Sequence, residues 1–132
     1  MAMKLTEELM KESFLPHLGD GETLITTTYA IKQNWFITYL SKYYFLGLTN
    51  KRLLIMQVSM FFKEKNIKKV ESQEISLVTI KETILGKTIK IKTNNGEVFK
   101  GRVNNTVIGL KNNRERVDTL LGYLRQLPAY IE

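Results

Sequence analysis

The segment spanning residues 86–103, GKTIKIKTNNGEVFKGRV, constrains the fold more than any other part of the chain. Apolar and cationic residues alternate on both sides of the turn NNG at 94–96, which is typical of two strands joined by a tight loop. A two-residue loop would pair a lysine with Phe99 and mix the two faces. A three-residue loop pairs Ile91 with Phe99 and puts Gly96 at a left-handed position. The sequence therefore predicts an antiparallel hairpin with one apolar face.

The opposite face of this hairpin is a basic surface. It carries Lys90, Lys92, Lys100 and Arg102, together with Val98. The whole chain has a formal net charge of +7, so this face could attract nucleic acid or an anionic membrane. Nucleic-acid binding usually needs aromatic side chains among the cations for base stacking. None lies on this face, and we do not expect a nucleic-acid partner.

A second hairpin is predicted at 43–58. Its loop is either Asn50-Lys51 or the four residues TNKR at 49–52, and both place Leu48 opposite Leu53. Both of its faces are apolar, whereas a strand with one wet face should alternate. One face carries Tyr44, Leu46, Leu48, Leu53 and Ile55. The other carries Tyr43, Phe45, Leu54, Met56 and Val58, and something must cover it. The N-terminal helix or a second subunit could do so, and both alternatives stay open.

The remaining segments complete a mainly β chain. Residues 5–14 read as a short helix capped by Thr6 and ended by Pro16. Residues 22–32, 67–72 and 75–82 read as strands, and 59–66 as a loop or strand end. Asn113 is predicted to cap a helix at 114–127 with an apolar stripe. We expect an N-terminal helical extension at 1–17 and one domain at 18–132.

This order of elements resembles the bacterial pleckstrin-homology-like family, whose relatives are the PH and GRAM domains. The resemblance rests on GE at 21–22, LTNKRLLIM at 48–56, EISLVTIKE at 74–82, IKIKTNNGEVF at 89–99 and the terminal helix. It implies a seven-stranded, bent antiparallel barrel or sandwich closed by a C-terminal amphipathic helix. It also implies a non-enzymatic interaction or assembly module that is often oligomeric.

The resemblance further implies where a ligand would bind. Eukaryotic PH domains often bind phosphoinositide headgroups between the first and third inter-strand loops. There this chain offers Lys32 and Lys42 without a Lys-x-Arg motif, and the TNKR turn should lie at the other end. The loops 32–42 and 60–65 could place aromatic and cationic side chains against an anionic membrane. The candidate lipid contacts are Lys32, Trp35, Lys42, Phe61, Phe62, Lys63 and Lys65.

Catalysis and cofactor binding have little support in the sequence. His17 is the only histidine, there is no cysteine, and no glycine-rich phosphate loop is present. We therefore expect neither enzyme activity nor a cofactor.

The N-terminus lacks the apolar core of a signal peptide, so we expect a cytoplasmic protein that can associate with the membrane periphery. The primary expectation is a module that self-associates through its apolar strand faces, as a homo-oligomer or with a protein partner. The alternative is binding to anionic lipid headgroups.

Overall fold

The structure is a computed structural model that describes residues 5–32 and 41–131. Its elements are α1 (Glu7–Phe14), η1 (Leu15–His17), β1 (Leu24–Lys32), β2 (Lys42–Thr49), β3 (Leu53–Val58), β4 (Glu64–Val70), η3 (Ser72–Glu74), β5 (Ile75–Glu82), β6 (Gly86–Thr93), β7 (Val98–Asn104) and α2 (Asn113–Arg125). Within the described residues, the strands form one antiparallel sheet in the order β4-β3-β2-β1-β7-β6-β5. The predicted fold class is confirmed.

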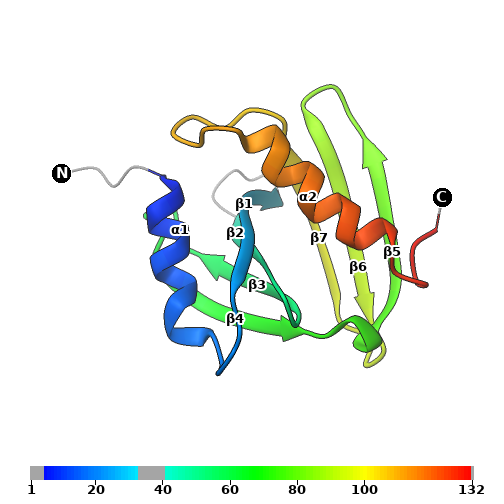
Figure 1. Ribbon diagram of the computed structural model, residues 1–132. Coiled ribbons are helices and arrows are strands. Elements are labelled where there is room, and N and C mark those ends of the chain that lie inside the picture. The colour runs from blue at the N-terminus through cyan, green and yellow to red at the C-terminus, as the bar shows by residue number, and fades with distance from the viewer. Residues whose placement is uncertain (1–4, 33–40, 132) are drawn as a thin grey trace.

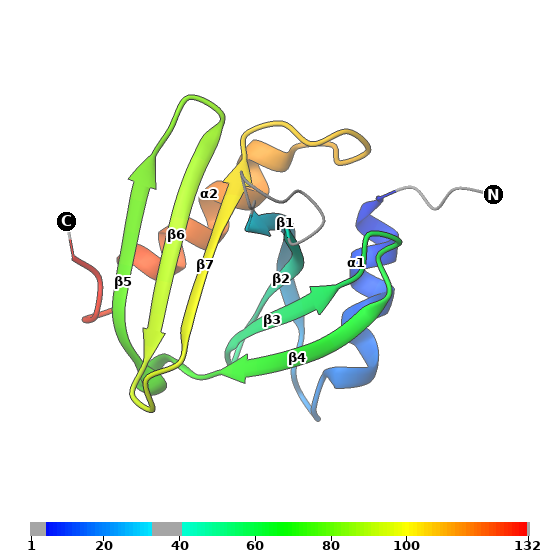
Figure 2. The ribbon, with the colours of Figure 1, turned by 180° about the vertical axis from the view of Figure 1, so that it is seen from behind.

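The sheet is curled into a half-barrel (Figure 1). Strands β1 to β4 form one half and β5 to β7 the other, and the two halves cross at a steep angle (Figure 2). Helix α2 packs on the concave side. Its apolar stripe, Val117, Leu120, Leu121 and Leu124, is fully buried among inward-facing residues of both halves. The amphipathic pattern read from the sequence therefore supplies the main core.

Helix α1 covers the outer face of the β2–β3 hairpin. Phe45, Leu54 and Met56 are 0% exposed. They belong to a second apolar cluster with Met10 and Phe14 of α1. Thr6 caps the helix as predicted, since its hydroxyl accepts a hydrogen bond from the Leu9 amide at 3.1 Å. The chain's own N-terminal segment, helped by residues 107–110, thus buries the face that the sequence left uncovered.

The registers of both predicted hairpins are confirmed. Leu48 pairs with Leu53, Ile91 pairs with Phe99, and Gly96 has a φ of 87°. Several element boundaries differ from the prediction by a few residues. Strand β4 begins at Glu64 rather than residue 67, because the pairing with β3 continues past a register shift near Gln57.

The cap predicted for the last helix is also wrong. Asn112, with a left-handed φ of 56°, is the N-cap residue, and Asn113 is the first helical residue. The Asn113 side chain is buried. It accepts a hydrogen bond from Thr28 Oγ1 at 3.1 Å and donates one to the Asn104 carbonyl at 2.7 Å. Adjacent asparagines are equivalent as caps in sequence, and tertiary contacts with β1 and β7 decide between them.

Candidate functional site

β1 and β7 lie side by side at the place here called the β1–β7 seam. Among the described residues, Ala30 pairs with Val103 and Ile31 with Arg102. β1 also pairs with β2 as far as Lys32, opposite Lys42. A hollow lies on each side of the sheet at this point.

The inner hollow, here called the basic cleft, has a volume of about 330 Å³. Four lysines from four strands line it: Lys32, Lys42, Lys68 and Lys100. The Gln57 and Asn66 side chains lie across the β3–β4 pair and are hydrogen-bonded at 3.1 Å. The remaining lining side chains are apolar: Tyr44, Ile55, Ile67, Val98 and Phe99. A cleft with amide and ammonium groups above apolar side chains is suited to bind a small anionic group that belongs to a larger molecule.

The charges of the basic cleft are incompletely neutralised. No carboxylate is among the lining residues that the structure describes. Glu97, in the β6–β7 turn, reaches Lys68 at 2.6 Å, and this ion pair is about half exposed. Within the part of the chain that the structure describes, Lys32, Lys42 and Lys100 form no ion pair. The described residues of the cleft therefore carry positive charge without a matching number of carboxylates.

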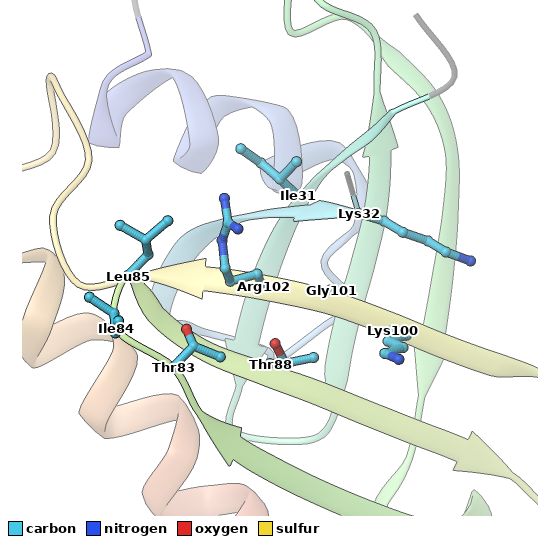
Figure 3. Close-up of a pocket in the computed structure, with 9 residues that line it drawn as sticks. All are labelled: Ile31, Lys32, Thr83, Ile84, Leu85, Thr88, Lys100, Gly101 and Arg102. Carbon is cyan, nitrogen blue, oxygen red and sulfur yellow. The ribbon is translucent and has the colours of Figure 1, made fainter. Parts of the chain in front are cut away.

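The outer hollow, here called the outer groove, has a volume of about 860 Å³ (Figure 3). Ile31 and the β5–β6 loop residues Ile84 and Leu85 give it an apolar character, and Ile84 is 98% exposed. Arg102 rises from β7 between Ile31 and Leu85. The rest of the lining is Lys32, Thr83, Thr88, Lys100 and Gly101, so the groove shares two lysines with the basic cleft.

The β3–β4 loop presents apolar side chains at the same end of the half-barrel as the cleft. Ser59 ties the loop together, since its carbonyl accepts from the Phe62 amide at 2.9 Å and its amide donates to the Lys63 carbonyl at 2.8 Å. Phe62 has a φ of 62° and packs inward on Phe45, with ring centroids 6.0 Å apart. Met60 and Phe61 point outward and are 67% and 68% exposed.

The predicted lipid contacts are thus split. Phe61, Lys63 and Lys65 are exposed on or beside the β3–β4 loop, whereas Phe62 belongs to the cluster under α1. Lys32 and Lys42 meet in the basic cleft. Trp35 lies outside the described residues.

At the opposite end of the half-barrel, the cationic side chains of Arg52 and Lys51 form hydrogen bonds within the fold. The buried Glu22 carboxylate accepts hydrogen bonds from Arg52 Nε at 3.0 Å, Arg52 Nη2 at 2.9 Å, Thr49 Oγ1 at 2.7 Å and the Gly19 amide at 2.9 Å. Arg52 above all lowers the pKa of Glu22 to about 2, against the effect of burial. Lys51 Nζ donates to the Asp20 carbonyl at 2.8 Å. These contacts fix the TNKR turn to residues 19–23, and the arrangement is here called the clasp.

The other candidate residues lie as follows. Tyr43 and Val58 extend the outer apolar cluster, with Val58 fully buried. Lys90 pairs with Lys100 across β6 and β7, and Lys92 pairs with Val98, as the predicted basic surface requires. His17 contacts Glu64 at 2.7 Å and joins η1 to β4.

Among the described residues there is no cluster of three or more potential metal-ligating His, Cys, Asp or Glu side chains. No helix in that part of the chain is long and apolar enough to cross a membrane.

Three polar residues of the cleft were not predicted from the sequence: Gln57, Asn66 and Lys68. Their strands were recognised in whole or in part, but their approach to β7 depends on the curl of the sheet. A cross-strand amide pair at the end of a hairpin was the one local signal available.

Comparisons with known proteins agree with this geometry. No curated protein matches the chain. The hSac2 domain of the human phosphoinositide phosphatase Sac2 superposes with a TM-score of 0.55 at 11% identity, over 91% of this chain and 77% of that one. The C-terminal domain of an unknown protein from Leishmania infantum gives a TM-score of 0.55 at 17% identity, over 92% and 96% of the two chains. The family model described as "Bacterial PH domain" matches residues 18–117, and the chain belongs to this family.

Proposed function

We propose that this domain is a peripheral binding module whose basic cleft takes up an anionic lipid headgroup. PH-like domains are generally non-catalytic, which fits a binding role. The observation that carries the proposal is that Lys32, Lys42, Lys68 and Lys100 all line one cleft, with no carboxylate among its described lining residues. The exposed Met60 and Phe61 at the same end would enter the membrane interface while the lysines meet the headgroups.

Self-association through the outer face of the β2–β3 hairpin receives less support. Phe45, Leu54 and Met56 are already covered by α1 within one chain. A second copy would have to displace Met10 and Phe14, both fully buried, before reaching them. The lipid function needs no such rearrangement.

Sedimentation with vesicles of phosphatidylcholine, with and without phosphatidylserine, tests the proposal. We expect binding to the anionic vesicles alone. Because each lysine near an anionic surface contributes about 1 kcal/mol, the double variant Lys32→Glu with Lys42→Glu should bind at least about thirtyfold more weakly. Titration with free glycerophosphate in a calorimeter separates a membrane headgroup from a soluble phosphate. Heat from glycerophosphate together with no vesicle binding would contradict a membrane role.

The matched control is Lys92→Glu with Lys111→Glu. Both residues are exposed and line neither hollow. This variant has the same net charge as the test variant, so it measures the general effect of charge. Equal losses in both variants would show that overall charge, rather than the cleft, drives binding.

A further inference from the structure

The outer face of the half formed by β5 to β7 carries an array of cations. Figure 2 looks onto this face, with α2 behind the strands. Val78, Ile89 and Val103 are 0% exposed and belong to the main core, and side chains alternate between the two faces along a strand. The cations on the outward side, which form the basic sheet face, are Lys81, Lys90, Lys92, Lys100 and Arg102. This face extends the predicted basic surface of the β6–β7 hairpin onto β5.

The charges of the basic sheet face are not neutralised within the described residues. The other outward residues of the paired strands are Leu77, Thr79, Thr88 and Val98. The face therefore contains no carboxylate. None of its five cations forms an ion pair with another described residue. Lys81, Lys92 and Lys100 are exposed, so the charge is accessible to an anionic partner.

An extended chain that contacts this half of the sheet would lie over its face. The C-terminal segment covers the edge of β5, since the Val78 amide donates to the Ala129 carbonyl and the Ile131 amide donates to the Val78 carbonyl, both at 3.0 Å. Strand β6 pairs on both sides, with β5 and with β7. The face offers a partner side-chain charge instead of backbone groups.

The cations recur with the repeat of an extended polypeptide. Lys90 and Lys92 are two residues apart on β6, and Lys100 and Arg102 are two residues apart on β7. Residues on the same side of a strand lie roughly 6.6 Å apart. Carboxylates at every second residue of an extended peptide have the same spacing. A peptide lying along β6 and β7 would therefore place successive carboxylates opposite successive cations.

Other partners fit this face less well. Single-stranded nucleic acid is held by base stacking as well as by charge, and the face has no aromatic side chain. The core of a stable protein interface is poor in lysine, which argues against a globular partner. The β3–β4 loop lies on the other side of the molecule from β5 in both views (Figures 1 and 2). A membrane bound through that loop is therefore not expected to cover the face.

We infer that the basic sheet face binds an extended acidic segment of a partner protein, with carboxylates at alternate residues. Ion pairs between exposed groups are individually weak, so the binding depends on several pairs acting together. For the same reason it is expected to weaken as salt is added.

Two labelled peptides of equal charge test the inference by fluorescence anisotropy at low ionic strength. In Glu-Ser-Glu-Ser-Glu-Ser-Glu, an extended chain directs all carboxylates to one side, whereas in Glu-Glu-Glu-Glu-Ser-Ser-Ser it directs only half of them there. We expect saturable binding of the alternating peptide, about fivefold tighter than that of the clustered peptide. Amide NMR shifts should centre on β5 to β7. Failure of the alternating peptide to bind, or equal binding of the two peptides, overturns the inference.

Charge-reversal variants locate the site on the protein. Lys90→Glu with Lys92→Glu should weaken binding of the alternating peptide at least about tenfold, and Lys90→Gln with Lys92→Gln should cause a smaller loss. The matched control, Lys69→Glu with Lys111→Glu, has the same net charge as the first variant and changes exposed residues outside the face. It should bind the peptide nearly as well as the unmodified protein. Equal losses in the test and control variants would contradict the inference.

Two other probes identify a different occupant. Tighter binding of labelled oligothymidine than of the peptide, lost in Lys90→Glu with Lys92→Glu, would assign the face to nucleic acid. A larger loss of anionic vesicle binding in that variant than in its control would assign the face to the membrane. Either result overturns the inference. The lipid proposal is tested through Lys32 and Lys42 of β1 and β2, which lie outside the basic sheet face, so the two proposals can fail separately.

Discussion

The two ends of the half-barrel use cations in opposite ways. At the end with the β2–β3 turn, Arg52 forms a bidentate ion pair with Glu22, whose side chain is 0% exposed. At the end with the β1–β7 seam, Lys32 of β1 pairs with Lys42 of β2, and no carboxylate is among the described residues that line the cleft. The first arrangement holds a turn in place, and the second leaves positive charge available to a ligand.

This difference shows that the role of a basic residue beside a turn does not follow from the sequence around it. TNKR looks like the more obvious basic motif, yet its hydrogen bonds go to residues 19–23 of the same chain. The seam lysines are scattered over four strands and form a group through the curl of the sheet alone. A ligand site requires charges that the fold has not already neutralised.

The largest effect is expected at the clasp. Arg52→Leu leaves the buried Glu22 carboxylate without its main partner, and it should lower the free energy of unfolding by about 3 kcal/mol. Glu22→Gln should cost less, because Arg52 is 22% exposed and can reach water. Urea denaturation of both variants measures the asymmetry. Vesicle binding by the folded variants should match that of the unmodified protein, and a selective loss of binding would give the clasp a ligand role.

Acid should destabilise the clasp end first. The pKa of Glu22 in the folded protein is about 2, below its ordinary value of 4.5. The ionised carboxylate therefore stabilises the fold fully above about pH 4.5, and this contribution is lost as pH falls toward 2. Urea midpoints measured over this range should fall less steeply for Glu22→Gln than for the unmodified protein. Parallel pH profiles would show that Glu22 does not control acid stability.

A moderate effect is expected from Glu97→Gln at the cleft. This carboxylate contacts a cleft lysine, Lys68, at 2.6 Å. Its removal frees one positive charge, so anionic vesicles should bind about twofold to threefold more tightly. The urea midpoint should hardly change, because the ion pair is exposed. Unchanged vesicle binding would place Lys68 outside the headgroup contacts.

The smallest effect is expected on the stability of the cleft end. Lys32 and Lys42 occupy directly opposite strand positions, where like charges repel. Lys32→Gln with Lys42→Gln should therefore raise the free energy of unfolding by about 0.3 kcal/mol. Urea denaturation at low salt gives the measurement. A loss of stability instead would show that these lysines support the fold, as Arg52 does.

Local features of the fold could be predicted because local residues specify them. Gly96 and the alternation around it determine the register of the β6–β7 hairpin. The start of β4 was missed because the run Lys63, Glu64 and Lys65 follows three apolar residues without alternation. The Glu22–Arg52 pair was missed because the partners are 30 residues apart.

The candidate site could be predicted only in part. Lys32 and Lys42 followed from the family resemblance, while Lys100 was assigned to a surface and Lys68 was not named. The approach of β1, β2, β4 and β7 to one cleft depends on the curl of the sheet, which no local residue pattern specifies.

The position of α1 also determines where the folded unit can be cut. The family match covers residues 18–117, but α1 precedes it and most of α2 follows it. A fragment trimmed to the matched residues would expose Phe45, Leu54 and Met56 on one side and lose Leu120, Leu121 and Leu124 on the other. Such a fragment would present two apolar surfaces to solvent and aggregate on expression. Fusion partners and affinity tags therefore belong before α1 or after the segment that covers β5.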